Sequence, residues 1–174
     1  MYREPVRLDV DPSASSAAYP FSHGIRVRFA ETDAMGIVHH SRYLLYFEEA
    51  RVAYLRHLGR PYSEMRKDGI EHAVLETFVR YRRPLRFDEV MEVHVVLAKV
   101  TRASFQLAYL ITVDGEVRAT GVTAHGCVNQ EGRPVRMPEW LAELATPVSG
   151  AHSGVSAPRS DKAITSAGQA RTPN

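Results

Sequence analysis

One segment, residues 41–58, is apolar around most of a helical circumference, and this feature constrains the fold more than any other. Five of its residues recur at the spacing of a single helical face, namely Tyr43, Tyr46, Phe47, Ala50 and Tyr54. Leu44, Leu45, Val52 and Leu55 widen that face. Ser41 is a suitable N-cap, and Gly59-Arg60-Pro61 is a stop signal. Because a helix that is apolar on most sides must be covered by other structure, we expect this one to be enclosed by the rest of the fold.

The segments on both sides of this helix have the patterns of strands. Before it, Ile25, Val27 and Phe29 alternate with Arg26, Arg28 and Ala30, which predicts a strand with one buried face. After it, residues 73–82, 90–100, 104–113 and 116–129 read as strands, and Asp114-Gly115 predicts a tight hairpin. The order predicts an α+β fold in which one curved antiparallel sheet wraps around one long helix. Such a sheet has free edges and an uncovered face, so we expect a second copy to pair with it.

Composition sets the domain boundaries and excludes several classes of protein. Of 174 residues, 44% are hydrophobic and 24% charged, and the net charge is +2, which disfavours a general nucleic-acid binder. The N-terminal and C-terminal segments are rich in small and polar residues, so residues 1–20 and 147–174 are predicted to be flexible and disordered around a domain at 21–146. Cys127 is the single cysteine, and no apolar run suggests membrane insertion, so we expect a cytoplasmic protein.

The densest group of chemically capable residues is the loop at 32–40, which reads Thr-Asp-Ala-Met-Gly-Ile-Val-His-His. Asp33 could attack a carbonyl or act as general base toward water, and the unpaired N–H groups at the start of the helix could hold an oxyanion. The alternative is a purely structural role, in which the Asp33 carboxylate only accepts hydrogen bonds from nearby backbone N–H groups of a turn. A metal site at His23, His39 and His40 is a weaker possibility, and we predict no metal.

Motifs within residues 23–140 occur in a characteristic order. They are Arg26-Val27, Thr32-Asp33-x-x-Gly36-Ile37-Val38-x-His40-x-x-Tyr43, Tyr46-Phe47-Glu48-x-Ala50-Arg51, Tyr81-x-x-Pro84-x-Arg86-Phe87-Asp88 and Arg102-x-Ser104-Phe105. Together they resemble the signature of the 4-hydroxybenzoyl-CoA thioesterase family of hotdog-fold proteins. The resemblance is greatest to the branch typified by the acyl-CoA thioesterase of the bacterial Tol–Pal gene cluster. It therefore implies the hotdog fold.

The resemblance also implies roles for individual residues. Asp33 matches the catalytic aspartate of the family, which acts as nucleophile or general base, and Gly36 lets the loop bend. His40 matches a histidine of this branch, and its backbone N–H lies where the family supplies the oxyanion donor. The residues expected to contact substrate are Tyr43, Phe47 and Glu48 on the helix, and Arg102 in a turn where relatives place basic residues against the CoA phosphates.

The function that the resemblance implies is hydrolysis of an acyl-CoA without any cofactor. Members of the family are homodimers or homotetramers with active sites at the subunit interface. A thioesterase acting on acyl carrier protein is an alternative, because a basic patch for an acidic carrier would look like one for CoA phosphates. A non-catalytic acyl-CoA-binding protein is another, although the intact Asp33, Gly36 and His40 set counts against it. The motifs leave both aliphatic and aromatic acyl groups open.

Overall fold

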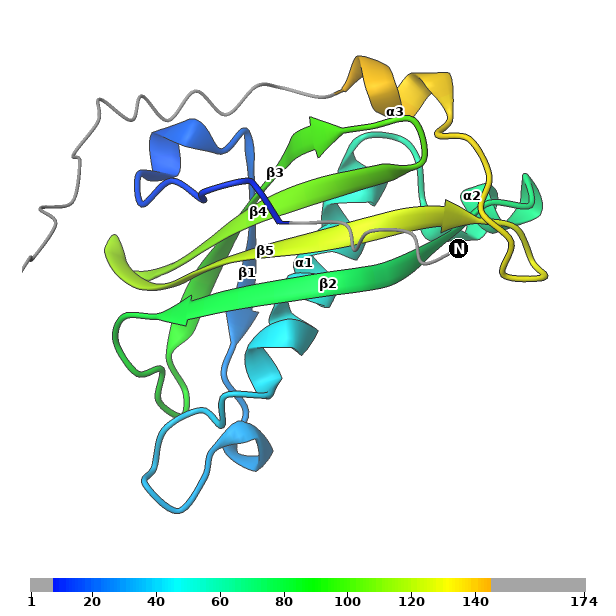
Figure 1. Cartoon of the computed structure of the whole chain (residues 1–174). Helices are drawn as coiled ribbons and strands as arrows, with labels where there is room; N and C mark the ends of the chain where they lie inside the picture. The colour runs from blue at the N-terminus through cyan, green and yellow to red at the C-terminus, as the bar shows by residue number, and fades with distance from the viewer. Residues whose placement is uncertain (1–7, 145–174) are drawn as a thin grey trace, which may run out of the picture.

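The computed structural model describes residues 8–144 of the chain (Figure 1). Its α-helices are α1 (Arg42–His57), α2 (Tyr62–Lys67) and α3 (Glu139–Glu143), and 3-10 turns occur at Ser16–Ala18 and Phe29–Glu31. The strands are β1 (Phe21–Arg26), β2 (Glu71–Tyr81), β3 (Val90–Val100), β4 (Ser104–Val113) and β5 (Glu116–Val128). The tail predicted to be disordered from residue 147 lies outside the described residues. No helix within residues 8–144 is both long and apolar enough to cross a membrane.

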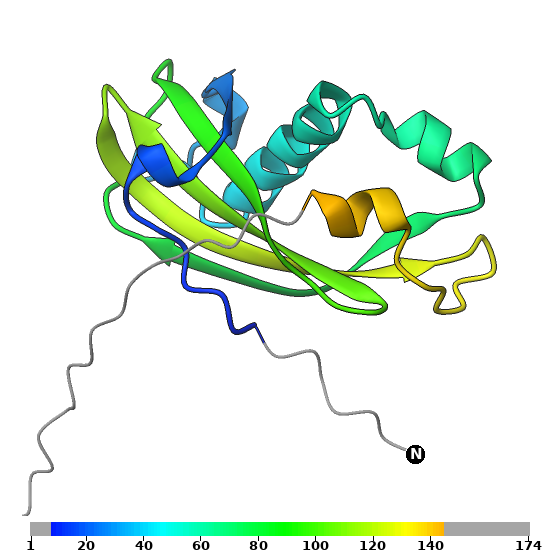
Figure 2. The same ribbon diagram turned by 90° about the horizontal axis from the view of Figure 1, so that it is seen from above.

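The strands form one antiparallel sheet in the order β1-β3-β4-β5-β2, which curves around α1 (Figures 1 and 2). The predicted α+β hotdog architecture is therefore confirmed. The register of β2 against β5 places Tyr81 opposite Ala119 at one end of the sheet and Glu71 opposite Val128 at the other. Among the described strands β2 pairs with β5 alone, so its outer edge is open.

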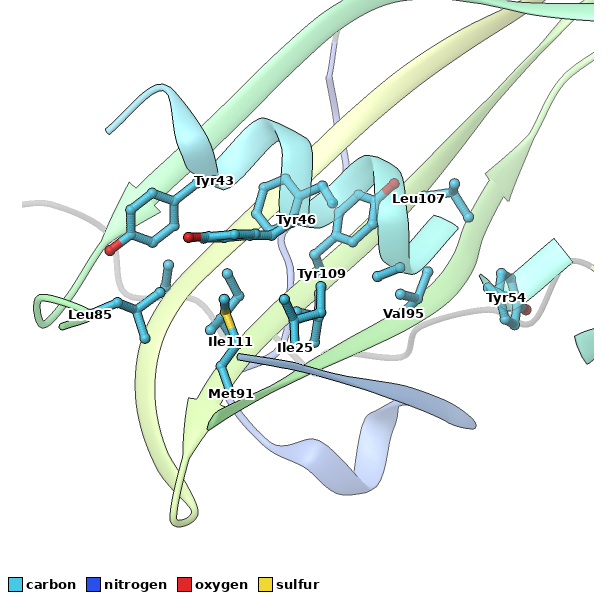
Figure 3. Packing of buried hydrophobic residues seen from close by; sticks show 14 of the residues in the cluster. Ile25, Tyr43, Tyr46, Tyr54, Leu85, Met91, Val95, Leu107, Tyr109 and Ile111 are labelled. Carbon is cyan, nitrogen blue, oxygen red and sulfur yellow. The ribbon is translucent and has the colours of Figure 1, made fainter. Parts of the chain in front are cut away.

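The core lies between α1 and the concave face of the sheet (Figure 3). All five residues of the predicted helical face are buried. Phe47 stacks on Tyr109 of β4, with ring centroids 4.3 Å apart and planes 15° apart. The ring of Phe47 fits because β5 has a glycine beneath it: a Cβ added to Gly121 would lie 2.4 Å from the ring. The long helix therefore packs closely against β5 at the position where Gly121 has no side chain.

Two details of the predicted apolar pattern were wrong. Phe29 is 75% exposed, because the chain leaves the sheet after Arg26 and turns at Phe29–Glu31. Leu44 and Leu45 are 39% and 46% exposed, so α1 is not enclosed on every side. Leu44 lines a cavity together with Val74 of β2, and Leu45 lines another together with His23 of β1.

Residues 8–20 pack against the convex face of the sheet, although residues 1–20 were predicted to be flexible. Tyr19 is buried against Val96, Ala108 and Leu110, and the Asp9 carboxylate pairs with Lys99 and accepts a hydrogen bond from Gln106. The Tyr19 ring and the Asp9–Lys99 ion pair hold this segment on the sheet. The linker-like composition of residues 12–18 gave no sign of these contacts. Part of the face that the sequence left uncovered is therefore occupied by the chain itself.

Candidate active site

The loop between the Phe29–Glu31 turn and α1 is a tight turn built around Asp33. The Asp33 N–H donates to the Ile37 carbonyl at 2.9 Å, and the Gly36 N–H donates to the Asp33 carbonyl at 2.9 Å. Gly36 has a φ of +70°, which glycine adopts without strain. Carboxylate Oδ1 of Asp33 accepts the Met35 N–H at 2.8 Å, whereas Oδ2 has no hydrogen-bond partner among the described residues. The turn role expected for this side chain is real, but it uses only one of its oxygens.

His40 lies two residues before the start of α1, next to the N-cap residue Ser41, and offers a backbone donor. Its carbonyl accepts the Tyr81 hydroxyl at 3.1 Å, and its ring lies 4.1 Å from that of His39. Within residues 8–144 the His40 N–H has no hydrogen-bond acceptor. Because N–H groups at a helix N-terminus carry a positive partial charge, this donor is suited to an oxyanion.

A cavity of about 330 Å³ brings these groups together. Asp33, His40 and Tyr43 line it on one side. The last residue of β2, Tyr81, and the three residues after it, up to Pro84, line the other side. The buried ring of Tyr43 meets that of Tyr81 edge-on, with centroids 4.9 Å apart. Burial raises the pKa of Tyr43, so its hydroxyl stays protonated at neutral pH. The structure therefore brings Asp33, His40 and Tyr43 together around one cavity. Gly36, the fourth predicted residue of this region, belongs to the turn that carries Asp33.

A buried carboxylate that the sequence analysis missed supports the loop from beneath. Glu31 is 4% exposed and accepts hydrogen bonds from the Tyr46 hydroxyl and the Arg28 N–H, both at 2.8 Å. Its carbonyl accepts the His39 N–H at 2.9 Å. Burial alone would raise the pKa of Glu31, but the hydrogen bonds from Arg28 and Tyr46 outweigh it, and the pKa is lowered. Glu31 is therefore charged at neutral pH and ties the loop to α1.

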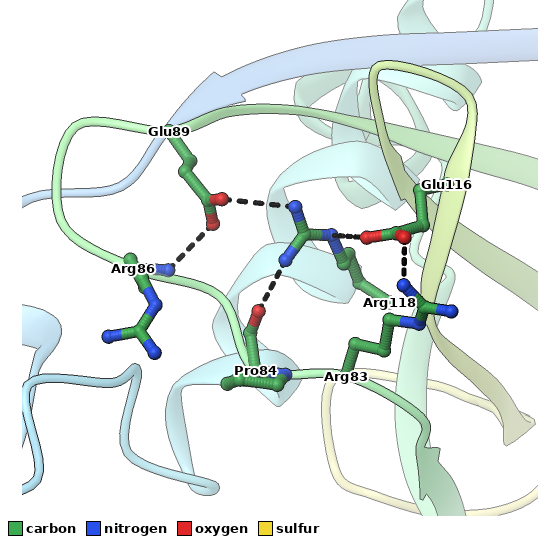
Figure 4. Close-up of polar contacts among 6 residues, drawn as sticks. All are labelled: Arg83, Pro84, Arg86, Glu89, Glu116 and Arg118. Atoms are coloured by element: carbon green, nitrogen blue, oxygen red, sulfur yellow. Dashed lines mark hydrogen bonds and ion pairs between the residues drawn. The ribbon is translucent and has the colours of Figure 1, made fainter.

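Arginines at the rim of the cavity are a second group that the sequence analysis passed over. Arg82 is exposed and forms no ion pair among the described residues. Its neighbour Arg83 pairs with Glu116 (Figure 4). Behind them Arg118 is anchored by Glu89 at 3.0 Å, Glu116 at 3.4 Å and the Pro84 carbonyl at 2.6 Å. The sequence does show two consecutive arginines, Arg82 and Arg83, inside the motif at residues 81–88. Because Arg83 pairs with Glu116, Arg82 is the one of the two that can bind an anion.

Three of the predicted substrate-binding residues lie elsewhere. Arg102 is exposed in the β3–β4 turn, at the end of the sheet where Ser104 faces Gly126, whereas Tyr81 lies at the opposite end. Phe47 and Glu48 do not line the cavity beside Asp33 but a separate one of about 150 Å³ between α1 and β2. Glu48 is exposed to solvent. Within one chain, therefore, Arg102 does not meet the other candidates.

Comparisons with known proteins agree with this geometry. Residues 27–144 match the family model of the thioesterase-like superfamily. The crystal structure of a hypothetical protein from Aquifex aeolicus shares 42% identity and a TM-score of 0.69, covering 73% of this chain and all of that one. Acyl-CoA thioesterase YneP of Bacillus subtilis (strain 168), provisionally so named, is 34% identical over 122 residues, which are 67% of this chain and 88% of its own.

The branch suggested by the motifs is also among the matches. Acyl-CoA thioester hydrolase YbgC of Escherichia coli O157:H7 is 29% identical over 84 residues, which are 48% of this chain and 63% of its own. The predicted family resemblance is thus confirmed. The matched segment contains the Asp33 loop, α1 and the whole sheet from β2 onward. On this match, and on a curved sheet wrapped around one long helix, the chain belongs to the thioesterase-like superfamily of hotdog-fold proteins.

Proposed function

We propose that this protein is an acyl-CoA thioesterase in which Asp33 is the nucleophile or general base and the His40 N–H is the oxyanion donor. One observation carries the proposal: a carboxylate oxygen and a backbone N–H that have no hydrogen-bond partner within residues 8–144 belong to residues that line the same cavity. The names of the relatives YneP and YbgC support the choice of a CoA thioester as substrate.

The proposed chemistry needs few groups because a thioester carbonyl is already activated. Asp33 attacks the carbonyl carbon, or removes a proton from a water that attacks it, and the carbonyl oxygen becomes an oxyanion beside the His40 N–H. The C–S bond then breaks, and the CoA thiolate leaves and takes up a proton. In the nucleophilic route, water hydrolyses the acyl–Asp33 anhydride. In both routes one water is consumed, and the acid and CoA are released.

Release of thiol from a set of acyl-CoAs tests the proposal directly. We expect turnover of at least one member of a panel of short, long, branched and aromatic acyl-CoAs by the full chain. Acyl carrier proteins bearing the same acyl groups are the matched alternative substrates, and faster turnover of those would favour the carrier-protein thioesterase. Tight binding of acyl-CoA with no thiol release would identify a non-catalytic binding protein instead.

Arg82 is the proposed contact for the CoA phosphates, in place of the predicted Arg102. Phosphate contacts lie far from the reacting carbonyl and act similarly in the ground and transition states. Arg82→Ala should therefore raise KM about tenfold with little change in kcat, as expected for loss of one charge-assisted contact. Arg102→Ala is the control and should leave KM unchanged. A rise in KM with Arg102→Ala alone would instead assign the phosphates to Arg102 of a second copy.

A second copy of the chain is the proposed partner along β2. This strand has an open edge and carries three exposed apolar side chains, Val74, Leu75 and Phe78. The exposed Leu44 of α1 lines a cavity together with Val74. Because the edge ends at Tyr81, which lines the cavity, a copy paired there would lie next to the site. The active site is therefore proposed to lie at the subunit interface.

Light scattering of the full chain at micromolar concentration should give at least twice the 19.5 kDa of one chain. Val74→Lys should weaken the assembly by placing a charge at its centre. Val90→Lys is the matched control, since Val90 is also an exposed strand valine but lies at the β1 side of the sheet. A wild-type monomer, or equal effects of the two substitutions, would refute an interface along β2.

A further inference from the structure

The second cavity, between α1 and β2, contains a buried cation that the proposed reaction does not use. We call it the Arg51 cavity; its polar lining residues are Glu48, Arg51, Thr77, Tyr109, Thr123 and His125. Arg51 is 7% exposed, and its Nη1 is fully buried without a hydrogen bond. Among the described residues its guanidinium forms no ion pair and only faces the Tyr62 ring, at 5.9 Å. Burying a guanidinium without an anion is unfavourable, so this arrangement indicates that an anion completes it.

A chain of hydrogen bonds in the same cavity leaves a further donor unused. The Thr123 hydroxyl lies 2.9 Å from the Tyr109 hydroxyl and 2.7 Å from Nε2 of His125. If the tyrosine donates to the threonine and the threonine to Nε2, the proton of His125 is on Nδ1, which is buried and without a partner. If the chain runs the other way, the Tyr109 proton is the unused one. Either direction leaves one donor hydrogen for a ligand.

Arg51 is the only buried positive charge around this cavity among the described residues. Burial, with the Arg51 charge next, lowers the pKa of His125 to about 3 and that of the neighbouring His72 to about 4, so both rings are neutral at pH 7. The one carboxylate in the lining, Glu48, is exposed to solvent and forms no ion pair with Arg51. Its charge is screened by water, so it does not neutralise the guanidinium.

The Arg51 cavity and the active-site cavity share the same two walls. Tyr43 of α1 and Tyr81 of β2 line the active-site cavity, whereas Arg51 and Thr77 of the same elements line the other. Eight residues of helix correspond to about 12 Å, and four residues of strand to about 13 Å. An extended hydrocarbon chain of about nine or ten bonds covers that distance. Leu44, Phe47 and Val74 provide the apolar lining of the Arg51 cavity.

We propose that the Arg51 cavity binds the far end of the acyl group, and that this end is a carboxylate about nine bonds beyond the thioester carbonyl. The inference rests on the proposed thioesterase function and narrows its substrate to medium-length acyl-CoAs with an ω-carboxyl group. The carboxylate accepts hydrogen bonds from Arg51 and from the spare donor of the Tyr109–Thr123–His125 chain. A carboxylate suits the site better than a hydroxyl, because it also supplies the missing counter-charge.

Three substrates of equal chain length test the proposal: 9-carboxynonanoyl-CoA, 10-hydroxydecanoyl-CoA and decanoyl-CoA, with hexanoyl-CoA as a chain too short to reach Arg51. For the wild-type protein we expect kcat/KM for the ω-carboxyl substrate to exceed that for decanoyl-CoA at least about tenfold. Arg51→Met should abolish this preference and leave hexanoyl-CoA turnover unchanged. Arg56→Met is the matched control, because Arg56 is an exposed arginine of the same helix, and it should keep the preference.

The wild-type selectivity is decisive even where Arg51→Met fails to fold, and Arg51→Lys, which keeps the charge, should retain part of the preference. Equal turnover of the three ten-carbon substrates would show that water or a second copy occupies the cavity, and would overturn the inference while leaving the thioesterase proposal intact. A preference for the hydroxyl-ended chain would also overturn it. No thiol release from any substrate, hexanoyl-CoA included, would refute the thioesterase function and this inference with it.

Discussion

Asp33→Asn should lower kcat for acyl-CoA hydrolysis by at least about 10², the lower end of what a positioned acid–base group contributes. The amide keeps the size of the side chain, and its oxygen can still accept the Met35 N–H that Oδ1 accepts at 2.8 Å. Only the negative charge is lost. Stability should therefore change little, and steady-state thiol release combined with thermal unfolding of the same samples separates the two effects.

His40→Ala provides an internal comparison for this prediction. The substitution removes the ring but keeps the backbone N–H, which is the proposed oxyanion donor, so kcat should fall less than with Asp33→Asn. A folded Asp33→Asn protein that hydrolyses acyl-CoA near the wild-type rate would rule out the proposed mechanism. A protein that unfolds instead would mean that Asp33 serves the turn, since its carboxylate also closes the hydrogen bond to Met35.

Gly121→Ala should destabilise the fold by about 3 kcal/mol or more, which is at the upper end for overpacking a core. A Cβ at this position would lie 2.4 Å from the Phe47 ring and 2.9 Å from the Phe78 backbone carbonyl. The ring is itself stacked on Tyr109 and the carbonyl belongs to β2, so neither can withdraw cheaply. Urea or thermal unfolding of the full chain measures the loss.

Gly126→Ala in the same strand is the matched control. The nearest atom to its added Cβ is Cδ1 of Leu75 at 3.2 Å, the end of an exposed side chain that can rotate away. This substitution should cost well under half as much as Gly121→Ala. Equal losses would show that strand propensity, and not the contact with Phe47, governs both positions.

The elements that could be predicted from the sequence are those whose signal is local. The helix expected at 41–58 is α1 at Arg42–His57, and the strands expected at 90–100 and 104–113 are β3 and β4 with the same bounds. The Asp114-Gly115 turn forms as expected, with both residues at positive φ. These features depend on neighbouring residues along the chain. α2 was missed because its six residues lie in a short polar segment without an apolar period.

The candidate site was predictable to the extent that it lies on one loop. Asp33, Gly36, His40 and Tyr43 are consecutive enough that a turn followed by a helix start must bring them together. Arg102 lies at the end of the sheet opposite to Tyr81, which could not be predicted because a turn motif does not say at which end of the sheet its turn lies. Arg82 and Glu31 were missed for the same reason, since their roles depend on which distant segment each one faces.

By itself the sequence determined the helix, the hairpins and the identity of the loop that carries Asp33, because backbone propensity and side-chain period act over a few residues. Only the tertiary structure decided that Tyr81 and Arg82 line the same cavity as Asp33 and that Leu44 and Leu45 remain exposed. It also decided that Arg51 is buried with no counter-charge from the part of the chain that the structure describes. The register of β2 on β5 and the packing of α1 over Gly121 set these positions. Both are settled by the sum of contacts between segments far apart in the chain, which no local pattern contains.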